Sequence, residues 1–210
     1  MGKRSDKPKR PKDKYYTWDA RAYDQVSRIF EQIGTFVEPC AGGGDMIYHL
    51  ERLGLRCLHA GDIEPTKPDN PRAAAVSVPI DAMAYWELPP DSALADADCI
   101  ITNPPWTRSA LHPFIDWCVQ SGKPAWLLID SNWAMTRQAR MMLRYCSHIV
   151  PNPRLKWIVD TTDSAMDDTA WFRFQAEPCE TILKNEFSPF IPGLPEYSHR
   201  DERPFLHELI

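Results

Sequence analysis

Residues 35–45 read Thr-Phe-Val-Glu-Pro-Cys-Ala-Gly-Gly-Gly-Asp, a short apolar run that ends in a carboxylate and a glycine-rich turn. The apolar run predicts a buried strand at 35–37, and the spacing of apolar residues predicts a helix at 46–53 that ends before Gly54. A β-rich run at 56–60 predicts a second strand. Together these segments form a βαβ unit, and open α/β sheets bind ligands at the carboxyl end of such a first strand.

Apolar runs and helical patterns continue to alternate along the chain, which predicts a mostly parallel sheet. Further helices are expected at 19–34, 111–119 and 136–145, and further strands at 73–80, 98–102, 124–129, 155–159 and 171–175. The linker between the last two strands is too short and polar for a crossover helix, so they should form an antiparallel hairpin. The sequence therefore predicts an α/β, Rossmann-like fold: a seven-stranded, mostly parallel sheet with an antiparallel final hairpin and helices on both faces.

The composition predicts one soluble domain with a charged arm. The chain has 210 residues, of which 43% are hydrophobic and 25% charged, enough apolar material for one sizeable core. The first fourteen residues hold seven of the 24 Lys and Arg and two of the 29 Asp and Glu, so they carry +5 and the remainder −10. We expect a basic flexible arm at 1–14, a globular domain at 15–178, and a Pro-rich extension at 179–210 that packs on the domain without extending the sheet.

The chain shows no sign of membrane insertion or export. No window approaches the roughly 18 uninterrupted apolar residues of a membrane span, and no apolar stretch follows the basic N-terminus as in a secretory signal. We therefore expect a cytoplasmic protein. The cysteines are scattered among mostly apolar neighbours, which is typical of reduced thiols, and neither they nor the histidines have the spacing of metal ligands. No metal site is expected.

The turn after the first predicted strand has the composition of a ligand-binding loop, because glycines let a ligand approach the backbone closely. Position 47 is Ile, so the G-x-G-x-x-G fingerprint of dinucleotide-binding loops is incomplete. Glu38 precedes the loop, and its negative charge would repel a phosphate and suit an amino group. A plain tight turn is the alternative interpretation of the three glycines.

Two further carboxylates follow predicted strands. Asp62 lies eighteen residues past Gly44, directly after the strand at 56–60, where an acidic side chain can accept hydrogen bonds from both hydroxyls of a ribose. Asp81 follows the third predicted strand and could accept a hydrogen bond from an adenine amino group. For both residues the alternative is an ordinary turn or helix-cap carboxylate.

Residues 98–106 read Asp-Cys-Ile-Ile-Thr-Asn-Pro-Pro-Trp, a buried strand that ends abruptly in two prolines and an aromatic residue. Proline fixes φ and lacks an N–H donor, so the Asn103 side-chain oxygen and the Pro104 carbonyl would be two rigid acceptors beside Trp106. A planar group that carries an NH₂ fits this arrangement, with its protons on the two acceptors and its face stacked on the indole. A simple Asn-Pro turn is the alternative, which the nearby glycine-rich loop disfavours.

With these motifs the chain resembles the class I S-adenosylmethionine-dependent methyltransferases, and among them the phage-type adenine-N6 DNA methyltransferases. The resemblance covers most of residues 13–175. It is carried by Asp13-Lys14-Tyr15-Tyr16-Thr17 before the first helix and by the segments E-P-C-A-G-G-G-D, G-D-I-E-P and T-N-P-P-W. Trp18 departs from the pattern, since the family often has Pro at this place. The resemblance implies that residues 15–178 are a methyltransferase domain.

The resemblance also implies S-adenosyl-L-methionine as the cofactor. Glu38 would meet the methionine amino group, Asp62 the ribose hydroxyls and Asp81 the adenine. The other implied cofactor-binding residues are Tyr16, Thr17, Pro39, Gly42, Gly44 and Ile63, with Tyr16 and Thr17 over the methionine end. The implied catalytic residues are those of the loop after the fourth strand, Asn103, Pro104, Pro105 and Trp106.

The expected reaction is methyl transfer to an exocyclic amino nitrogen, with N6 of adenine in DNA as the first choice. A flipped adenine is then the expected target, and the basic arm favours a nucleic-acid partner. Adenine in RNA, cytosine N4 and a protein glutamine amide stay open as substrates, because the loop suits any planar NH₂. A non-catalytic binding subunit and a nicotinamide-dependent oxidoreductase are alternatives of other classes. No membrane partner is expected, and the oligomeric state is open.

Overall fold

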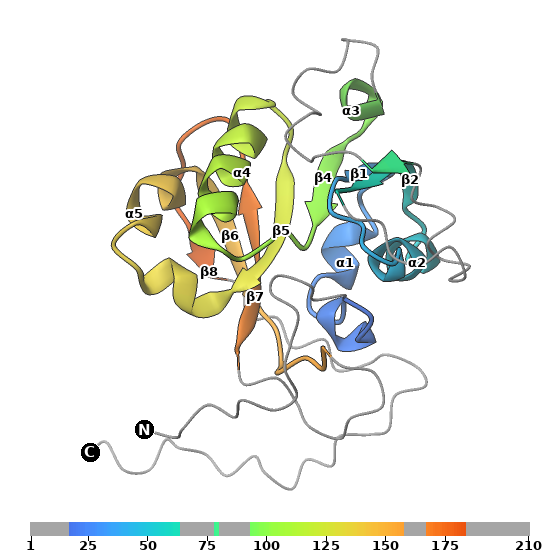
Figure 1. Ribbon diagram of the computed structural model, residues 1–210, viewed down its shortest axis with the longest axis horizontal. Helices are drawn as coiled ribbons and strands as arrows, with labels where there is room; N and C mark the ends of the chain where they lie inside the picture. Colours follow the sequence, from blue (N-terminus) through green and yellow to red (C-terminus); the bar gives the residue numbers. More distant parts are fainter. Residues whose placement is uncertain (1–16, 64–77, 80–92, 158–166, 184–210) are drawn as a thin grey trace, which may run out of the picture.

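One sheet of eight strands runs through the computed structural model, which describes residues 17–63, 78–79, 93–157 and 167–183 (Figure 1). The order across the sheet is β3-β2-β1-β4-β5-β7-β6-β8. Its strands are β1 (Thr35–Glu38), β2 (Arg56–Asp62), β3 (Val78–Pro79), β4 (Cys99–Thr102), β5 (Ala125–Asp130), β6 (Cys146–Pro151), β7 (Thr169–Phe174) and β8 (Ile182–Leu183). Pairs from β3 to β5 are parallel, and β7 is antiparallel to β5 and β6. The predicted α/β fold, a mostly parallel sheet with an antiparallel hairpin, is confirmed, and β8 adds an eighth strand to the seven that were predicted.

Helices cover both faces of the sheet, as predicted (Figure 1). They are α1 (Ser27–Phe30), α2 (Asp45–Arg52), α3 (Ala93–Asp96), α4 (Arg108–Gln120) and α5 (Ala139–Met142), with 3-10 turns at Ala20–Ala22, Ser131–Met135 and Leu143–Tyr145. The apolar sides of α1 and α2 join one buried cluster, whereas those of α4 and α5 join a second. The helices expected at 46–53 and 111–119 correspond to α2 and α4.

The two clusters lie on opposite faces because consecutive strand residues point in opposite directions. On β1, Phe36 belongs to the cluster under α1 and α2, and Val37 belongs to the cluster under α4. On β4, Ile101 and Ile100 divide in the same way. All four side chains are completely buried. Central strands covered on both faces therefore read as continuous apolar runs in the sequence.

The final hairpin uses a different strand from the one predicted. The segment at 146–151 forms β6 and pairs with β7, whereas residues 155–157 of the strand expected at 155–159 are not in the sheet, and 158–159 lie outside the described residues. Leu155 and Trp157 pack their side chains into the cluster under α1 instead. Between them, the Lys156 backbone N–H donates to Asp19 Oδ2 at 2.8 Å, a side chain rather than a strand neighbour. The alternation at 155–157 was therefore a signal of burial, not of strand pairing.

Two other segments depart from expectation. The helix expected at 19–34 is broken into a 3-10 turn at Ala20–Ala22 and α1, and the one expected at 136–145 is α5 followed by a 3-10 turn. The break in the first has a tertiary cause: the Trp171 indole Nε1 donates to the Ala22 carbonyl at 2.6 Å. The Val26 N–H, which would bond that carbonyl in a helix, bonds the Tyr23 carbonyl instead.

The C-terminal extension does add to the sheet, contrary to expectation. Residues 182–183 form β8, which lies parallel to β6 at the sheet edge. The earlier part of this extension is tied down next to the 3-10 turn that precedes β6, because the Cys179 N–H donates to the Arg144 carbonyl at 2.8 Å. The prolines of the extension begin at Pro189, after β8, and they do not report on the free edge that β6 offers for pairing.

The strand order reverses between β1 and β4, so the chain leaves the sheet in opposite directions on either side of this point. The glycine-rich turn follows β1, and the Asn-Pro-Pro-Trp loop follows β4, its parallel neighbour. Both loops therefore leave the same edge of the sheet side by side. Such switch points are where open α/β sheets bind ligands.

We predict that Trp171→Phe lowers the free energy of unfolding by about 1–3 kcal/mol, because the buried Ala22 carbonyl loses its donor. Urea unfolding measures the change. Trp126→Phe is the matched control: Trp126 is also buried, and within the described ranges its indole makes no hydrogen bond. Equal losses in the two variants would show that the bond to Ala22 contributes nothing beyond side-chain volume.

Candidate functional site

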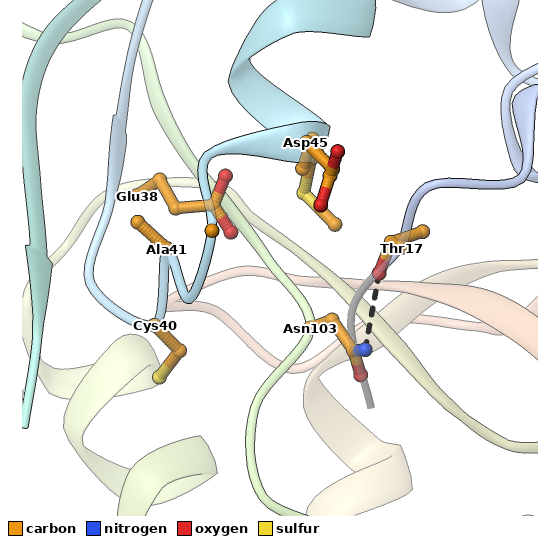
Figure 2. Close-up of a pocket in the computed structure, with 8 residues that line it drawn as sticks. Thr17, Glu38, Cys40, Ala41, Asp45 and Asn103 are labelled. Carbon is orange, nitrogen blue, oxygen red and sulfur yellow. Dashed lines mark hydrogen bonds between the residues drawn. The ribbon is translucent and has the colours of Figure 1, made fainter. Parts of the chain in front are cut away.

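A pocket lies where the loops after β1 and β4 meet the N-terminal segment (Figure 2). Its volume is about 220 Å³, counted with its opening to solvent. Figure 2 shows Glu38 and Ala41 on one side of the pocket and Thr17 and Asn103 on the other. The lining residues are Thr17, Glu38, Cys40, Ala41, Gly43, Asp45, Met46 and Asn103.

The glycine-rich turn is held in shape by β2. The Ala41 N–H donates to the Gly61 carbonyl at 2.8 Å, and the Gly42 N–H donates to Asp62 Oδ2 at 2.7 Å. Gly42 and Gly44 have φ values of 52° and 75°, in the left-handed region where any other residue is strained. The turn therefore brings bare backbone to the pocket and delivers the chain directly into α2, whose N-cap is Gly44.

Glu38 places an unpaired carboxylate oxygen inside the protein. The residue ends β1 and is 1% exposed, and its Oε2 has no hydrogen-bond partner among the described residues. Burial raises the pKa of Glu38 well above its usual range, and the charge of nearby Asp62 adds to this rise. Hydrogen bonds to the carboxyl group oppose this rise only in part. A buried carboxylate oxygen without a partner, such as Oε2, is costly unless a cation or donor meets it. The pocket wall therefore presents a buried acceptor that a positively charged group could meet.

Asn103 lies opposite, at the end of β4, and both ends of its carboxamide are bonded. Its Nδ2 donates to Thr17 Oγ1 at 3.0 Å, and its Oδ1 accepts from the Trp106 indole Nε1 at 3.0 Å. The same indole N–H also donates to the Leu128 carbonyl of β5 at 3.1 Å. An amide oxygen has two lone pairs, so Oδ1 can accept a second hydrogen bond.

The rest of the loop is rigid and partly enclosed. Pro104 is buried, and Pro105 and Trp106 are half-buried. The Trp106 ring packs edge-on against Trp157, with ring centroids 5.4 Å apart and planes at 83°. Trp106 also contacts both apolar clusters of the core. The loop is therefore anchored to the core through its aromatic residue.

The structure brings only part of the predicted cofactor set to the pocket. Thr17 and Glu38 line it, whereas Gly42 and Gly44 shape the turn and Asp62 bonds the Gly42 N–H. Pro39 is buried in the turn without lining the pocket, and Ile63 is 68% exposed. The remaining two predicted cofactor residues, Tyr16 and Asp81, lie outside the described residues.

Five residues of the pocket were not predicted individually: Cys40, Ala41, Gly43, Asp45 and Met46. All belong to the turn or to the start of α2, so the glycine run itself was the signal. Asp45 carried the clearest signal, because the helix dipole favours an acidic residue in the first turn of a helix, here α2. Side-chain chemistry alone could not distinguish Gly43, which lines the pocket, from Gly42 and Gly44.

Two kinds of feature are absent from the described residues. No helix there is long and apolar enough to cross a membrane. Across the same residues, no three His, Cys, Asp or Glu side chains are grouped as ligands of a metal ion. All six cysteines are free, and three of them, Cys99, Cys118 and Cys146, are buried.

The fold is similar to several solved structures, although neither a family model nor a curated protein matches the chain. A putative RNA methyltransferase from Pyrococcus horikoshii is 15% identical with a TM-score of 0.53, over 80% of this chain and 92% of that one. A modification subunit of a putative type I restriction enzyme from Vibrio vulnificus is 14% identical with a TM-score of 0.51, over 84% and 47%.

A putative class I S-adenosylmethionine-dependent methyltransferase from Listeria monocytogenes is 12% identical with a TM-score of 0.50, over 75% of this chain and 62% of that one. The chain thus spans less than two thirds of the Listeria and Vibrio proteins and nearly all of the Pyrococcus protein. One fold can carry many chemistries, so a likeness at such identities establishes architecture only. The chain has the fold of the class I S-adenosylmethionine-dependent methyltransferases.

Proposed function

We propose that this protein is an S-adenosylmethionine-dependent methyltransferase that acts on an exocyclic amino nitrogen, N6 of adenine in DNA. The observation that carries the proposal is the pairing of Glu38 and Asn103 across one pocket. One wall offers an unpaired carboxylate oxygen for an ammonium group, and the other offers a carboxamide for an NH₂ group. The methyl donor carries an amino-acid ammonium group, and the substrate that receives the methyl group carries an NH₂ group. The reaction needs a partner for each of these groups, side by side.

The residues present fit the cofactor. Glu38 Oε2 is an orphaned buried acceptor, which the ammonium group of the methionine end would satisfy. Asp62 uses one oxygen for the Gly42 N–H, and a carboxylate has further lone pairs for ribose hydroxyls. The pocket holds one end of the cofactor, and by the resemblance Asp81, Ile63 and Tyr16 would contact the rest. Bound S-adenosylmethionine supplies an electrophilic methyl group on its sulfonium.

The loop after β4 acts on the substrate amine. The Asn103 oxygen and the Pro104 carbonyl accept its N–H groups, which draws electron density toward the nitrogen and orients its lone pair. The nitrogen loses a proton to solvent once it is alkylated. Trp106 offers its ring to the flipped base. Catalysis in this arrangement comes from positioning and electrostatics, without a covalent intermediate on the protein.

Nucleic acid is favoured as the substrate by the basic segment at 1–14, which carries +5 on a chain of net charge −5. Two similar structures with TM-scores above 0.5 are described as a putative RNA methyltransferase and a modification subunit of a restriction enzyme. DNA is our choice because of the likeness of Asn-Pro-Pro-Trp to the loop of adenine-N6 DNA methyltransferases.

The direct test is transfer of radiolabelled methyl from S-adenosylmethionine to unmethylated DNA, RNA and cell protein in parallel. Digestion and mass spectrometry then identify the labelled product. We expect N6-methyladenine from DNA. Label in RNA, cytosine or glutamine would retain the reaction and replace the substrate, whereas cofactor binding without any transfer would favour a non-catalytic subunit. Binding of NADH in preference to S-adenosylmethionine would favour an oxidoreductase.

We predict that Asn103→Ala lowers methyl transfer by roughly 10²–10³-fold, because an oriented acceptor for the substrate N–H is lost. The dissociation constant for S-adenosylmethionine, measured by calorimetry, should stay within about threefold of wild type. Gln120→Ala, an exposed amide at the far end of α4, is the control and should be fully active. A fully active Asn103→Ala would contradict the catalytic assignment.

We predict that Glu38→Gln raises stability in the absence of ligand and weakens cofactor binding at least tenfold. The folded pKa of Glu38 lies above its usual value of 4.5 because of burial, so the native state holds its proton more tightly than the unfolded state. Wild-type stability is therefore lost as pH rises above 4.5, and the advantage of the variant should grow over that window to about 1–3 kcal/mol.

Thermal melts from pH 4 to 8 measure this difference. Glu51→Gln, an exposed carboxylate on α2, should change stability by less than about 0.5 kcal/mol. If Glu38→Gln melted like wild type at every pH and bound the cofactor normally, Glu38 would not be the partner of the ammonium group.

A further inference from the structure

We infer that Thr17 and Trp106 form a clamp that sets the orientation of the Asn103 carboxamide, which makes both of them positioning residues. The inference rests on the proposed function for its effect on rate. The geometry of the clamp belongs to the free protein and can be tested without a substrate.

The sense of the carboxamide is set by Trp106. An indole N–H is a donor only, so the group facing it must be the Asn103 oxygen and not its NH₂. This N–H is held in place by its second acceptor, the Leu128 carbonyl at 3.1 Å, which belongs to a completely buried residue of β5. Phe or Tyr at position 106 would keep an aromatic face but could not donate from this point. The loop therefore uses the particular chemistry of tryptophan.

The other end of the carboxamide is fixed by Thr17, which is 4% exposed. Its Oγ1 accepts from Asn103 Nδ2 at 3.0 Å, as the dashed line in Figure 2 shows. The Thr17 carbonyl accepts from the Tyr23 hydroxyl at 3.0 Å, and this tyrosine is also buried. Thr17 is therefore held from its backbone, independently of the asparagine that it contacts.

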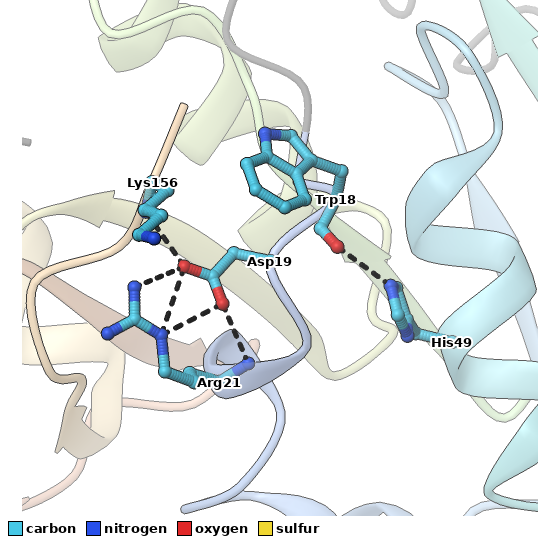
Figure 3. A network of polar contacts seen from close by, with 5 residues as sticks. All are labelled: Trp18, Asp19, Arg21, His49 and Lys156. Carbon is cyan, nitrogen blue, oxygen red and sulfur yellow. Dashed lines mark hydrogen bonds and ion pairs between the residues drawn. The ribbon is translucent and has the colours of Figure 1, made fainter. Parts of the chain in front are cut away.

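The two residues after Thr17 anchor the same segment to distant parts of the fold (Figure 3). The Trp18 carbonyl lies 2.9 Å from Nε2 of His49, on α2. The Asp19 carboxylate accepts at 2.8 Å from the backbone N–H of Lys156, which follows β6 in the chain. The same carboxylate forms an ion pair with the Arg21 guanidinium at 2.6 Å. Hydrogen bonds from Arg21 and Lys156 outweigh the effect of burial and keep the pKa of Asp19 below its usual range, so the anchor is charged at neutral pH.

Orientation matters because the two ends of a carboxamide do opposite things to an amine. The oxygen accepts an N–H and leaves the nitrogen lone pair directed at the methyl group. A carboxamide turned by half a rotation would present its NH₂, which donates to that lone pair and blocks the attack. With Trp106 at Oδ1 and Thr17 at Nδ2, a flipped carboxamide would place its NH₂ against the indole N–H, so that two donors would face each other.

Matched variants separate the orienting hydrogen bonds from the effects of side-chain volume and of aromatic stacking. Thr17→Val keeps the shape and removes the hydroxyl, Thr17→Ser keeps the hydroxyl, and Trp106→Phe keeps an aromatic face and removes the N–H. We expect Thr17→Val and Trp106→Phe each to lower kcat at least tenfold, with KM for both substrates and cofactor Kd within threefold. Thr17→Ser should retain kcat within threefold of wild type. The double variant should lose less than the product of the single losses, because both act on one group.

A spectroscopic readout needs no turnover. In ¹⁵N-labelled protein, the Asn103 side-chain NH₂ pair is assigned by its loss in Asn103→Ala. Its resonances should move, and its hydrogens should exchange faster, in Thr17→Val and in Trp106→Phe, and Thr17→Ser should restore the wild-type spectrum. Trp106→Phe tests the clamp from its other end if Thr17→Val does not fold.

The outcomes separate the clamp from the proposed function. If the Asn103 resonances changed in both variants while the wild-type protein transferred no methyl group, that result would retain the clamp and remove the proposed function. Unchanged resonances and unchanged kcat in both Thr17→Val and Trp106→Phe would overturn the clamp. Loss of kcat in Thr17→Val that only follows a loss of cofactor affinity would overturn it too, since Thr17 would then be a cofactor contact alone.

Discussion

The parallel pairing of β1 with β4 is the contact on which the site depends. It aligns Phe36 with Cys99 and Val37 with Ile100, so the loops that follow the two strands leave the sheet together. Asp98 secures the opposite end of the pair, where its Oδ2 accepts from the backbone N–H groups of Gly34 and Thr35 at 3.1 and 2.7 Å. Hydrogen bonds from Thr35 keep the pKa of Asp98 below its usual range, so this carboxylate is ionised throughout the neutral range.

Three described segments at the carboxyl edge are hydrogen-bonded to other elements of the fold. The glycine-rich turn is bonded to β2, the Asn-Pro-Pro-Trp loop is bonded to β5 through Trp106, and the segment at 17–19 is bonded to α2 and to Lys156. This rigidity surrounds one group that disfavours folding, the buried Glu38 carboxyl. Loops that are held by several hydrogen bonds can keep such a group buried despite its cost. Unfavourable burial of this kind is common where a ligand supplies the missing partner.

Much of the fold could be read from local pattern, and the exceptions share one cause. Central strands such as β4 and β5 are covered on both faces, so their continuous apolar runs were clear signals. The segment at 155–157 alternates apolar and charged residues like a half-buried strand, but Leu155 and Trp157 pack into the cluster under α1 without pairing. In contrast, β6 pairs although it contains Ser147 and His148, which weaken a strand signal. Pattern reports burial, whereas pairing depends on which strand edge is available.

The sequence by itself determined which residues can do chemistry here: a carboxylate before a glycine turn, and an asparagine locked between a strand and two prolines. These are local properties, because glycine and proline act on their own backbone and burial follows from apolar neighbours. Only the tertiary structure decided that Thr17 accepts from Asn103 and that Trp106 donates to the Leu128 carbonyl. It also decided that the Ala22 carbonyl accepts from Trp171 where a continuous helix would have used it. Those contacts join residues that are 22 to 149 positions apart, and no local pattern encodes such a pairing.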